Sequence, residues 1–151
     1  MTDRNLLIVK LVSLALVAVA LVIAGIQFYD HRNFQEEVVK GPGVTQVRKL
    51  SDYFEPLKGT INDCNIYIFD SGVPGGTAFL IGSSHPEEPA GNLTAQLFVE
   101  NAKLTKGRLI VAIRANQSAS RVTRPGDAYP LYFTIETPWG EKKFRMGDRW
   151  S

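Results

Sequence analysis

The stretch that decides the fold runs from Thr77 to Arg114 and reads TAFLIGSSHPEEPAGNLTAQLFVENAKLTKGRLIVAIR. Its first part, Thr77–Gly82, is nearly all apolar and predicts a strand that is buried on both faces. Pro89 suits the first turn of a helix, because its missing N–H would have no intrahelical partner there. Asn92–Leu104 continues as an amphipathic helix, and Arg108–Arg114 is a second apolar run that predicts a strand.

The helix is expected to present one apolar face, which carries Leu93, Leu97 and Leu104. A strand, a helix and a second strand in this order predict a parallel pair with a right-handed crossover. Functional loops of α/β sheets gather at the carboxyl ends of such strands. We therefore expect His85 and Asn116, each just beyond a strand, on the same rim of the sheet.

Shorter elements lie on both sides of this unit. Asn65–Asp70 (NIYIFD) is rich in β-branched and aromatic residues and predicts a strand, and Ser71–Gly76 predicts a turn. Tyr132–Glu136 and Lys142–Met146 surround a turn with proline and glycine, which predicts a β-hairpin. The expected fold is α/β: an N-terminal transmembrane helix, then a partial mixed sheet with a crossover helix and a C-terminal β-hairpin.

The segment Leu6–Phe28 reads LLIVKLVSLALVAVALVIAGIQF and carries one charge, Lys10. As a helix it spans the hydrocarbon core of a bilayer, which is about 30 Å thick. A cleaved signal peptide is the main alternative, with Arg4 and Lys10 as its charged start and Val22–Ala24 as the cleavage site. The apolar stretch is long for a signal peptide, which favours an uncleaved, single-pass membrane anchor.

The predicted boundaries are a short tail (1–5), the anchor (6–28), a juxtamembrane linker (29–43) and a soluble domain (44–151). The linker ends at Gly41-Pro42-Gly43, which breaks a helix. Positive charges before and after the anchor balance, so they do not decide its orientation. The short amino-terminal tail favours a soluble domain on the extracytoplasmic side.

Composition and charge exclude few classes of protein. The net charge is +2, and charged residues make up 21% of the 151 residues. This balance does not indicate a nucleic-acid-binding protein, which would normally carry a concentrated basic face. Cys64 is the only cysteine, so no intrachain disulfide can form. Nothing in the sequence indicates the oligomeric state.

One short motif, His85-Pro86-Glu87-Glu88, offers metal chemistry. A catalytic zinc ion commonly takes three protein ligands at about 2.0–2.3 Å and keeps one position open for water. His-x-x-Glu can supply two of them from one bend into a helix, because residues three apart project to the same side. Glu87 competes at His-x-Glu spacing. The commoner explanation of such a match is a solvated surface histidine near acidic residues.

The motif belongs to a longer ordered pattern. FLIGSSHPEEPAG, NLTAQLFVENAKLTKG and RLIVAIRAN follow one another between Phe79 and Asn116. This region resembles the amino-terminal part of the succinylglutamate desuccinylase/aspartoacylase family of zinc hydrolases, which are relatives of the zinc carboxypeptidases. The fold that this resemblance implies is an incomplete zinc-carboxypeptidase-like fold.

The resemblance also implies a function. His85 and Glu88 would ligate Zn²⁺, and Arg114 and Asn116 would lie near the site as substrate-binding residues. The protein would be a hydrolase of amide bonds in which zinc polarises a carbonyl and activates a water molecule. Its partners would be a small N-acyl amino acid or peptide substrate and the lipid bilayer, through Leu6–Phe28.

The catalytic set is incomplete in this sequence. The third zinc ligand of the family is a histidine that lies well after this region, as does the general-base glutamate. No histidine follows His85 here, so both groups are expected beyond Ser151. The chain then corresponds to a fragment or a degenerate homologue, and we expect weak or no zinc binding and no hydrolysis from it alone.

A second class of function stays open. The chain would then be a non-catalytic, single-pass membrane protein with a small α/β interaction domain. Aromatic residues between Tyr129 and Trp150 would supply its partner surface. The same aromatic residues are equally expected as the two faces of a hairpin, one of them packed on a core.

Overall fold

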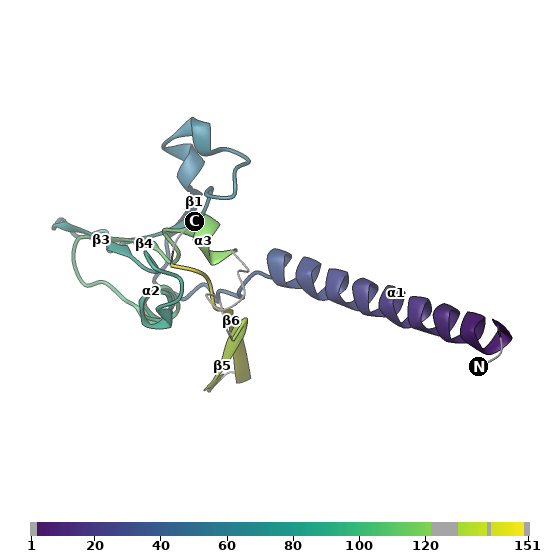
Figure 1. Ribbon diagram of the computed structural model, residues 1–151. Helices are drawn as coiled ribbons and strands as arrows, with labels where there is room; N and C mark the ends of the chain where they lie inside the picture. Colours follow the sequence, from purple (N-terminus) through teal and green to yellow (C-terminus); the bar gives the residue numbers. More distant parts are fainter. Residues whose placement is uncertain (1–2, 122–129, 139, 150–151) are drawn as a thin grey trace. The chain divides into compact units, whose positions relative to one another are not determined.

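The computed structural model describes residues 3–121, 130–138 and 140–149. The chain divides into two compact units, Met1–Phe34 and Gln35–Ser151. The first unit contains a single helix, α1 (Asp3–Asn33), and the second contains the sheet and the other helices (Figure 1). The predicted linker 29–43 therefore divides between the two units.

Helix α1 is long and apolar enough to cross a membrane. Its 31 residues include the whole predicted anchor, Leu6–Phe28, whose side chains are all exposed. The helix has no polar stripe because apolar residues surround its axis, as a lipid-facing helix requires. The prediction of a long apolar helix at the amino terminus is confirmed.

A mixed sheet of four strands forms the centre of the second unit, in the order β1-β2-β4-β3. The strands are β1 (Gln46–Lys49), β2 (Asn65–Asp70), β3 (Thr77–Ile81) and β4 (Arg108–Ala112). β3 and β4 run parallel, whereas β2 is antiparallel to both β4 and β1. The predicted parallel pair around a crossover helix is confirmed, and β2 has the predicted bounds.

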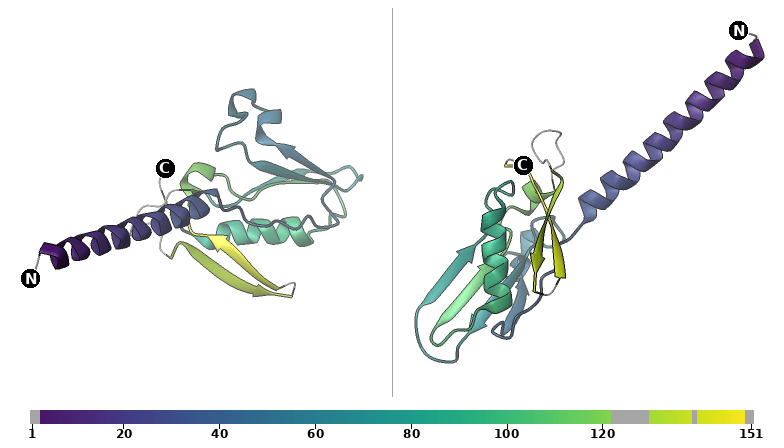
Figure 2. Two further views of the ribbon diagram at one scale, coloured as in Figure 1. Left: turned by 90° about the vertical axis from the view of Figure 1, so that its right-hand side faces the viewer. Right: turned by 90° about the horizontal axis from the view of Figure 1, so that it is seen from below.

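Helix α2 (Pro89–Asn101) lies against one face of this sheet (Figure 2). Pro89 occupies its first turn, as predicted. Side chains of α2 and of the central strands form the main hydrophobic core, which consists of Val44, Tyr67, Phe69, Ala95, Val99, Leu109, Val111 and Ile113. Ala95 is small, so the helix approaches the strands closely.

The buried face of α2 differs from the predicted one. Asn92, Ala95, Gln96 and Val99 point inward, whereas Leu97 is 57% exposed. Of the predicted apolar face, Leu93 is half-buried and Leu97 lies outside the core, whereas Leu104 follows the end of α2 and packs against the core. Two of the inward positions are polar because the surrounding structure supplies hydrogen bonds that a sequence pattern cannot show.

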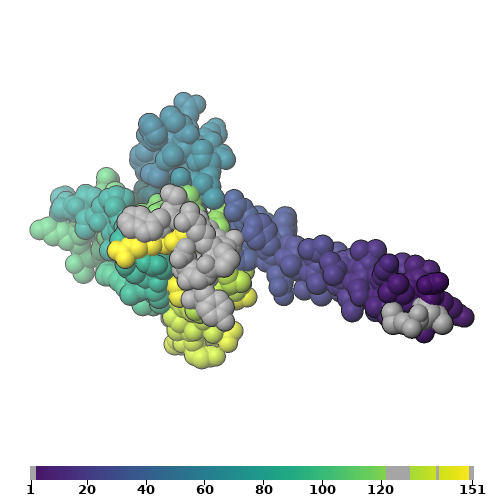
Figure 3. All heavy atoms as spheres, in the orientation of Figure 1, coloured from purple at the N-terminus to yellow at the C-terminus, as the bar shows by residue number. Residues whose placement is uncertain are grey.

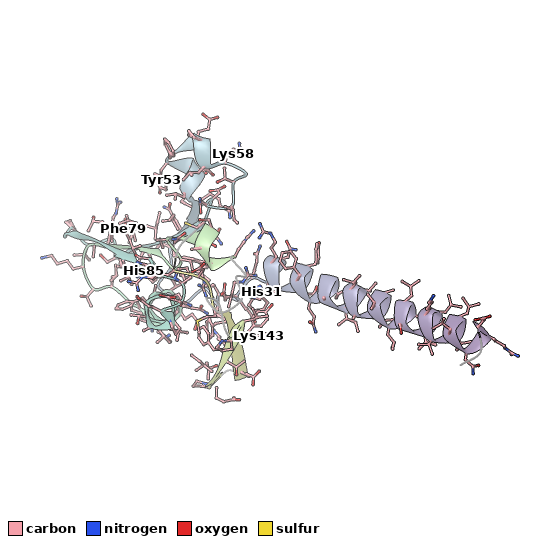
Figure 4. The ribbon with its side chains drawn as sticks, in the orientation of Figure 1. His31, Tyr53, Lys58, Phe79, His85 and Lys143 are labelled. Atoms are coloured by element: carbon pink, nitrogen blue, oxygen red, sulfur yellow. The ribbon has the colours of Figure 1, made fainter. Side chains whose placement is uncertain are left out.

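The burial of β3 was also predicted wrongly. Phe79 is 59% exposed and Ile81 is 50% exposed, although both were expected in a strand buried on both faces. β3 is an edge strand, and α2 covers only the face that carries Leu80. Figure 4 shows Phe79 on the side of the sheet away from α2.

Smaller elements complete the second unit. They are the short helices η1 (Leu50–Asp52), η2 (Glu55–Leu57) and α3 (Gln117–Ser120) and the strands β5 (Tyr132–Thr137) and β6 (Gly140–Arg145). β5 and β6 pair antiparallel, which confirms the predicted hairpin. The hairpin and the η1–η2 segment project in opposite directions from the sheet layer (Figure 3).

The segment that follows α1 packs along α2 in the second unit. Gly41 N donates to Val99 O at 3.2 Å, and the side chain of Gln96 donates to Glu37 O at 2.9 Å. The buried amide of Gln96 thus satisfies a backbone carbonyl of the neighbouring segment. We call residues 35–43 the strap, because they run along the helix instead of extending α1.

Candidate functional site

The loop that follows β3 is held against the loop that follows β4. Gly82 N donates to Ala112 O at 2.8 Å, and Ala115 N donates to Gly82 O at 2.9 Å. Asn116 N then donates to Ser83 O at 3.4 Å. The two segments therefore stay side by side past the ends of the parallel strands. Asn116 and the loop that leads to His85 share one rim of the sheet, as expected.

Ser83 stands out within this loop. Its φ is +53°, the only positive value at a non-glycine residue among the described residues. A left-handed conformation costs a residue with a Cβ roughly 1–2 kcal/mol. The Ser83 side chain is buried, and its Oγ has no hydrogen-bond partner among the described residues.

We expect Ser83→Gly to stabilise the second unit. The change removes the strain of a left-handed backbone at serine and the cost of a buried hydroxyl without a hydrogen-bond partner. It adds an opposing cost, because glycine loses more backbone entropy on folding than serine does. The expected gain is about 1 kcal/mol in the free energy of unfolding. Urea denaturation measures it, with Ser84→Gly, an exposed neighbour, as the control. A loss of stability with Ser83→Gly would contradict the assignment of strain.

The two predicted zinc ligands lie together at the entry to α2. His85 Nδ1 is 3.3 Å from Glu88 Oε1, and Glu88 N donates to His85 O at 3.0 Å. This turn brings residues three apart to the same side, and Glu88 takes the N-cap position of α2. The side chains of His85 and Glu88 are 35% and 60% exposed, so both reach solvent. Without a metal, such a solvent-exposed contact is worth about 0–1 kcal/mol.

The spacing of the two donor atoms fits part of a zinc site. Two ligand atoms at 2.0–2.2 Å from a tetrahedral zinc ion lie about 3.3–3.6 Å apart. The observed distance of 3.3 Å between His85 Nδ1 and Glu88 Oε1 falls at the lower end of this range. No cluster of three or more His, Cys, Asp or Glu side chains occurs among the described residues. The described residues therefore bring two candidate donor atoms together at this turn, and the zinc ligation itself stays a prediction.

Glu87, the alternative ligand, has a different neighbour. Its Oε1 lies 3.7 Å from Arg149 Nη1, close to the described end of the chain. Glu88, and not Glu87, is the acidic side chain paired with His85. The geometry thus favours the His-x-x-Glu spacing over the His-x-Glu spacing.

Asn116 makes hydrogen bonds that stabilise the loops at the same rim of the sheet. Its Oδ1 accepts from Ala119 N and from Ser118 Oγ, both at 3.1 Å, which caps the short helix α3. Its Nδ2 lies 3.5 Å from Ser84 O. Asn116 therefore ties the loop before His85 to α3, and its predicted role in substrate binding stays a prediction.

Arg114 is not on the exposed rim. Its guanidinium is buried, with Nη2 donating to Glu36 Oε1 at 2.5 Å and to Arg145 O at 3.1 Å. Nη1 donates to Ser120 Oγ at 3.3 Å. Burial lowers the pKa of Arg114, and the nearby Glu36 carboxylate opposes this shift because it favours the charged form.

Several buried polar residues that the sequence analysis did not identify lie around Arg114. Asn92, with its amide oriented to satisfy both partners, accepts from Arg114 Nη2 at 3.1 Å and donates to Pro89 O at 2.8 Å. Glu36 Oε1 also accepts from Arg145 N at 3.1 Å. Arg145 is itself buried, and burial lowers its pKa as well. Glu36 therefore joins the strap to the segment that follows β4 and to β6.

The only sequence signal for Glu36 was a charge in a segment predicted as a linker. Charged residues are common in linkers, so the pattern gave no reason to select this carboxylate. Its role depends on where the strap lies, and only the folded structure shows that.

Comparison of the chain with protein-family models, with curated proteins and with solved structures gave no match. Membership of the desuccinylase/aspartoacylase family therefore stays a prediction, which rests on the ordered residues between Phe79 and Asn116.

Proposed function

We propose that this chain contributes two zinc ligands, His85 and Glu88, to a membrane-anchored hydrolase of amide bonds. The observation that carries the proposal is the 3.3 Å separation of His85 Nδ1 and Glu88 Oε1 at the carboxyl end of a parallel strand. Functional loops of α/β sheets occur at that edge. The ordered likeness to the desuccinylase/aspartoacylase family supports a substrate with an acylated amine, such as an N-acyl amino acid or a peptide.

The residues of the chain act mainly by positioning. His85 would bind the metal through Nδ1, and Glu88 would add an anionic oxygen from the N-cap position of α2. Hydrogen bonds from the residues after β4 hold the preceding loop and limit its movement. A zinc ion held there supplies Lewis-acid chemistry and lowers the pKa of a bound water molecule. The third ligand and the general base must come from outside the described residues.

We expect the full chain in detergent to bind zinc weakly, through His85 and Glu88. Two ligands leave the ion mostly hydrated, so the affinity falls far below that of a structural zinc site. His85→Ala and Glu88→Ala should each weaken binding by roughly tenfold or more, since each removes one of two donors. Titration against a chromophoric zinc chelator measures these affinities.

Glu87→Ala is the matched control for this titration. Glu87 lies in the same turn but faces Arg149, so its loss should leave zinc affinity nearly unchanged. Equal affinity of the parent protein, His85→Ala and Glu88→Ala would remove the metal site from the proposal. If only Glu87→Ala weakened zinc binding, the acidic ligand would be Glu87, at the His-x-Glu spacing, and not Glu88.

A second candidate function is a non-catalytic, single-pass membrane protein with an α/β interaction domain. The exposed apolar side chains of β3 favour it, because large exposed apolar groups often mark contact sites. The zinc titration separates the two candidates, since an interaction domain has no reason to bind zinc through His85 and Glu88.

The proposed location of the second unit is the extracytoplasmic side of a membrane that α1 crosses. The length and apolar character of α1 support the anchor, and the short tail before it supports the orientation. Digestion of intact cells by an added protease tests the orientation, because a cytoplasmic domain would survive.

A further inference from the structure

The turn formed by residues 85–88 is held from two sides. On its amino-terminal side, Ser83 O accepts from the backbone N–H of Asn116 at 3.4 Å. On its carboxyl-terminal side, Pro89 in the first turn of α2 accepts through its carbonyl from the buried amide of Asn92 at 2.8 Å. These two restraints come from different elements, the segment after β4 and helix α2. The position of the turn therefore depends on how firmly those two elements are joined.

One buried guanidinium joins the two restraints. Arg114 Nη2 donates to Asn92 Oδ1 at 3.1 Å, on the side of α2. Arg114 Nη1 donates to Ser120 Oγ at 3.3 Å, and this hydroxyl donates to Asn116 O at 2.9 Å. A serine hydroxyl accepts one hydrogen bond while it donates another, so both contacts of Ser120 form together. Two short chains of hydrogen bonds therefore start at Arg114 and end on the two flanks of the turn.

Burial and charge fix the position of this guanidinium. The exposed fractions of Arg114, Asn92 and Ser120 are 4%, 1% and 2%. Glu36 of the strap accepts from Arg114 Nη2 and supplies the opposite charge that a buried guanidinium requires. The N–H donors of arginine lie in one rigid plane, so they also fix the directions of the groups that they bind.

We propose that Arg114 is a positioning residue that holds the turn 85–88 in place, so that the two candidate zinc ligands stay within reach of one metal ion. This inference rests on the proposed function, because it takes the two side chains as zinc ligands. Arg114 needs no contact with the metal or with a substrate for this role. Residues that orient metal ligands affect metal affinity although they do not touch the ion. Through Glu36, the strap becomes part of the support of the site.

Amide hydrogen exchange of the full chain in detergent, followed by NMR, tests this support without any metal. Asn92→Ala breaks the chain of hydrogen bonds on the α2 side, so the amides of Glu88 and Gly91 should exchange several-fold faster. Ser120→Ala breaks the other chain, so the amide of Asn116 should exchange several-fold faster instead. Unchanged exchange at these three amides in both variants would overturn the proposal.

Titration of the same variants with zinc tests the consequence for metal binding. Asn92→Ala and Ser120→Ala should each weaken zinc binding by roughly tenfold, although both keep the two ligands. Gln96→Ala is the matched control, because Gln96 is also a buried polar residue of α2 but donates to Glu37 O, away from the turn. It should lower the unfolding free energy and keep the zinc affinity. Equal losses of zinc affinity in Gln96→Ala and Asn92→Ala would overturn the proposal, since general destabilisation would then explain both.

The double variant Glu36→Leu with Arg114→Met separates positioning from stability. Apolar side chains of similar size replace both charges, so much of the folding stability should remain. The donors to Asn92 and Ser120 are lost, however, so zinc affinity should still fall by roughly tenfold. Zinc affinity equal to that of the parent protein would overturn the proposal. If the zinc affinity of the parent protein did not depend on His85, the metal site of the proposed function would fail, and the amide exchange would still decide whether Arg114 holds the turn.

Discussion

Glu36→Ala should destabilise the second unit by about 3–5 kcal/mol, the range observed when one partner of a buried ion pair is removed. The Glu36 carboxylate accepts from Arg114 Nη2 and from the backbone N–H of Arg145. Both arginine side chains are buried, so water cannot easily replace the lost carboxylate. The change also removes the hydrogen bonds that join the strap to the segment after β4 and to β6.

Urea denaturation of the full chain in detergent measures this effect through tryptophan fluorescence. Both tryptophans of the sequence belong to the second unit, so the signal does not follow α1. Glu37→Ala is the matched control, because Glu37 is exposed and contributes its backbone carbonyl, which alanine keeps. We expect the control to change the unfolding free energy by less than about 0.5 kcal/mol.

The double variant Glu36→Leu with Arg114→Met provides a further check. Replacement of both members of a buried ion pair by apolar residues of similar volume is often neutral. We therefore expect it to recover much of the stability that Glu36→Ala loses. Equal stability of Glu36→Ala and the parent protein would show that the strap does not depend on this carboxylate.

Gly82→Ala should cost about 3 kcal/mol or more, because the added methyl group overlaps fixed atoms. A Cβ at Gly82 would lie 2.4 Å from Ile113 O, 2.7 Å from Ala95 Cβ and 2.8 Å from Gly91 O. Two of these atoms belong to the backbone and the third lies in the core. Relief of the overlap must separate α2 from the ends of β3 and β4, which also displaces the loop before His85.

Gly76→Ala is the control for the Gly82 variant. A Cβ at Gly76 meets no atom within 4 Å, and its backbone does not require a positive φ. We expect its unfolding free energy to stay within about 0.5 kcal/mol of the parent value. Similar urea midpoints for both glycine variants would contradict the close packing at Gly82. Weaker zinc binding by Gly82→Ala at temperatures where it stays folded would link this packing to the candidate site.

The site region was predictable because its signals are local. His85 and Glu88 lie three residues apart on a bend, and Pro89 marks the start of the helix, so chain geometry alone brings their side chains together. The parallel relation of β3 and β4 also followed, since a helix between two apolar strands favours a crossover. Asn116 then had to lie near the same edge.

The long-range contacts were not predictable from the pattern. Arg114 was expected near the substrate, yet its guanidinium is buried against Glu36, which lies 78 residues earlier in the sequence. Asn92 and Gln96 are polar residues of an amphipathic helix, and both are buried because Arg114 and the strap supply their hydrogen-bond partners. A hydrogen bond between distant segments produces no periodic pattern of apolar and polar residues in either segment, so the sequence does not reveal it.

The sequence by itself determined the elements: a long apolar helix, the strands at Asn65 and Thr77, the crossover helix and the hairpin. Apolar spacing, proline and glycine specify these through local backbone preferences. Only the tertiary structure decided which surfaces those elements bury. It made β3 an exposed edge, turned Leu97 outward and joined the strap to the sheet through Glu36. The physical reason is that burial depends on which segments meet in space. An apolar run has the same sequence pattern at the centre of a sheet and at its edge, so the pattern does not predict its burial.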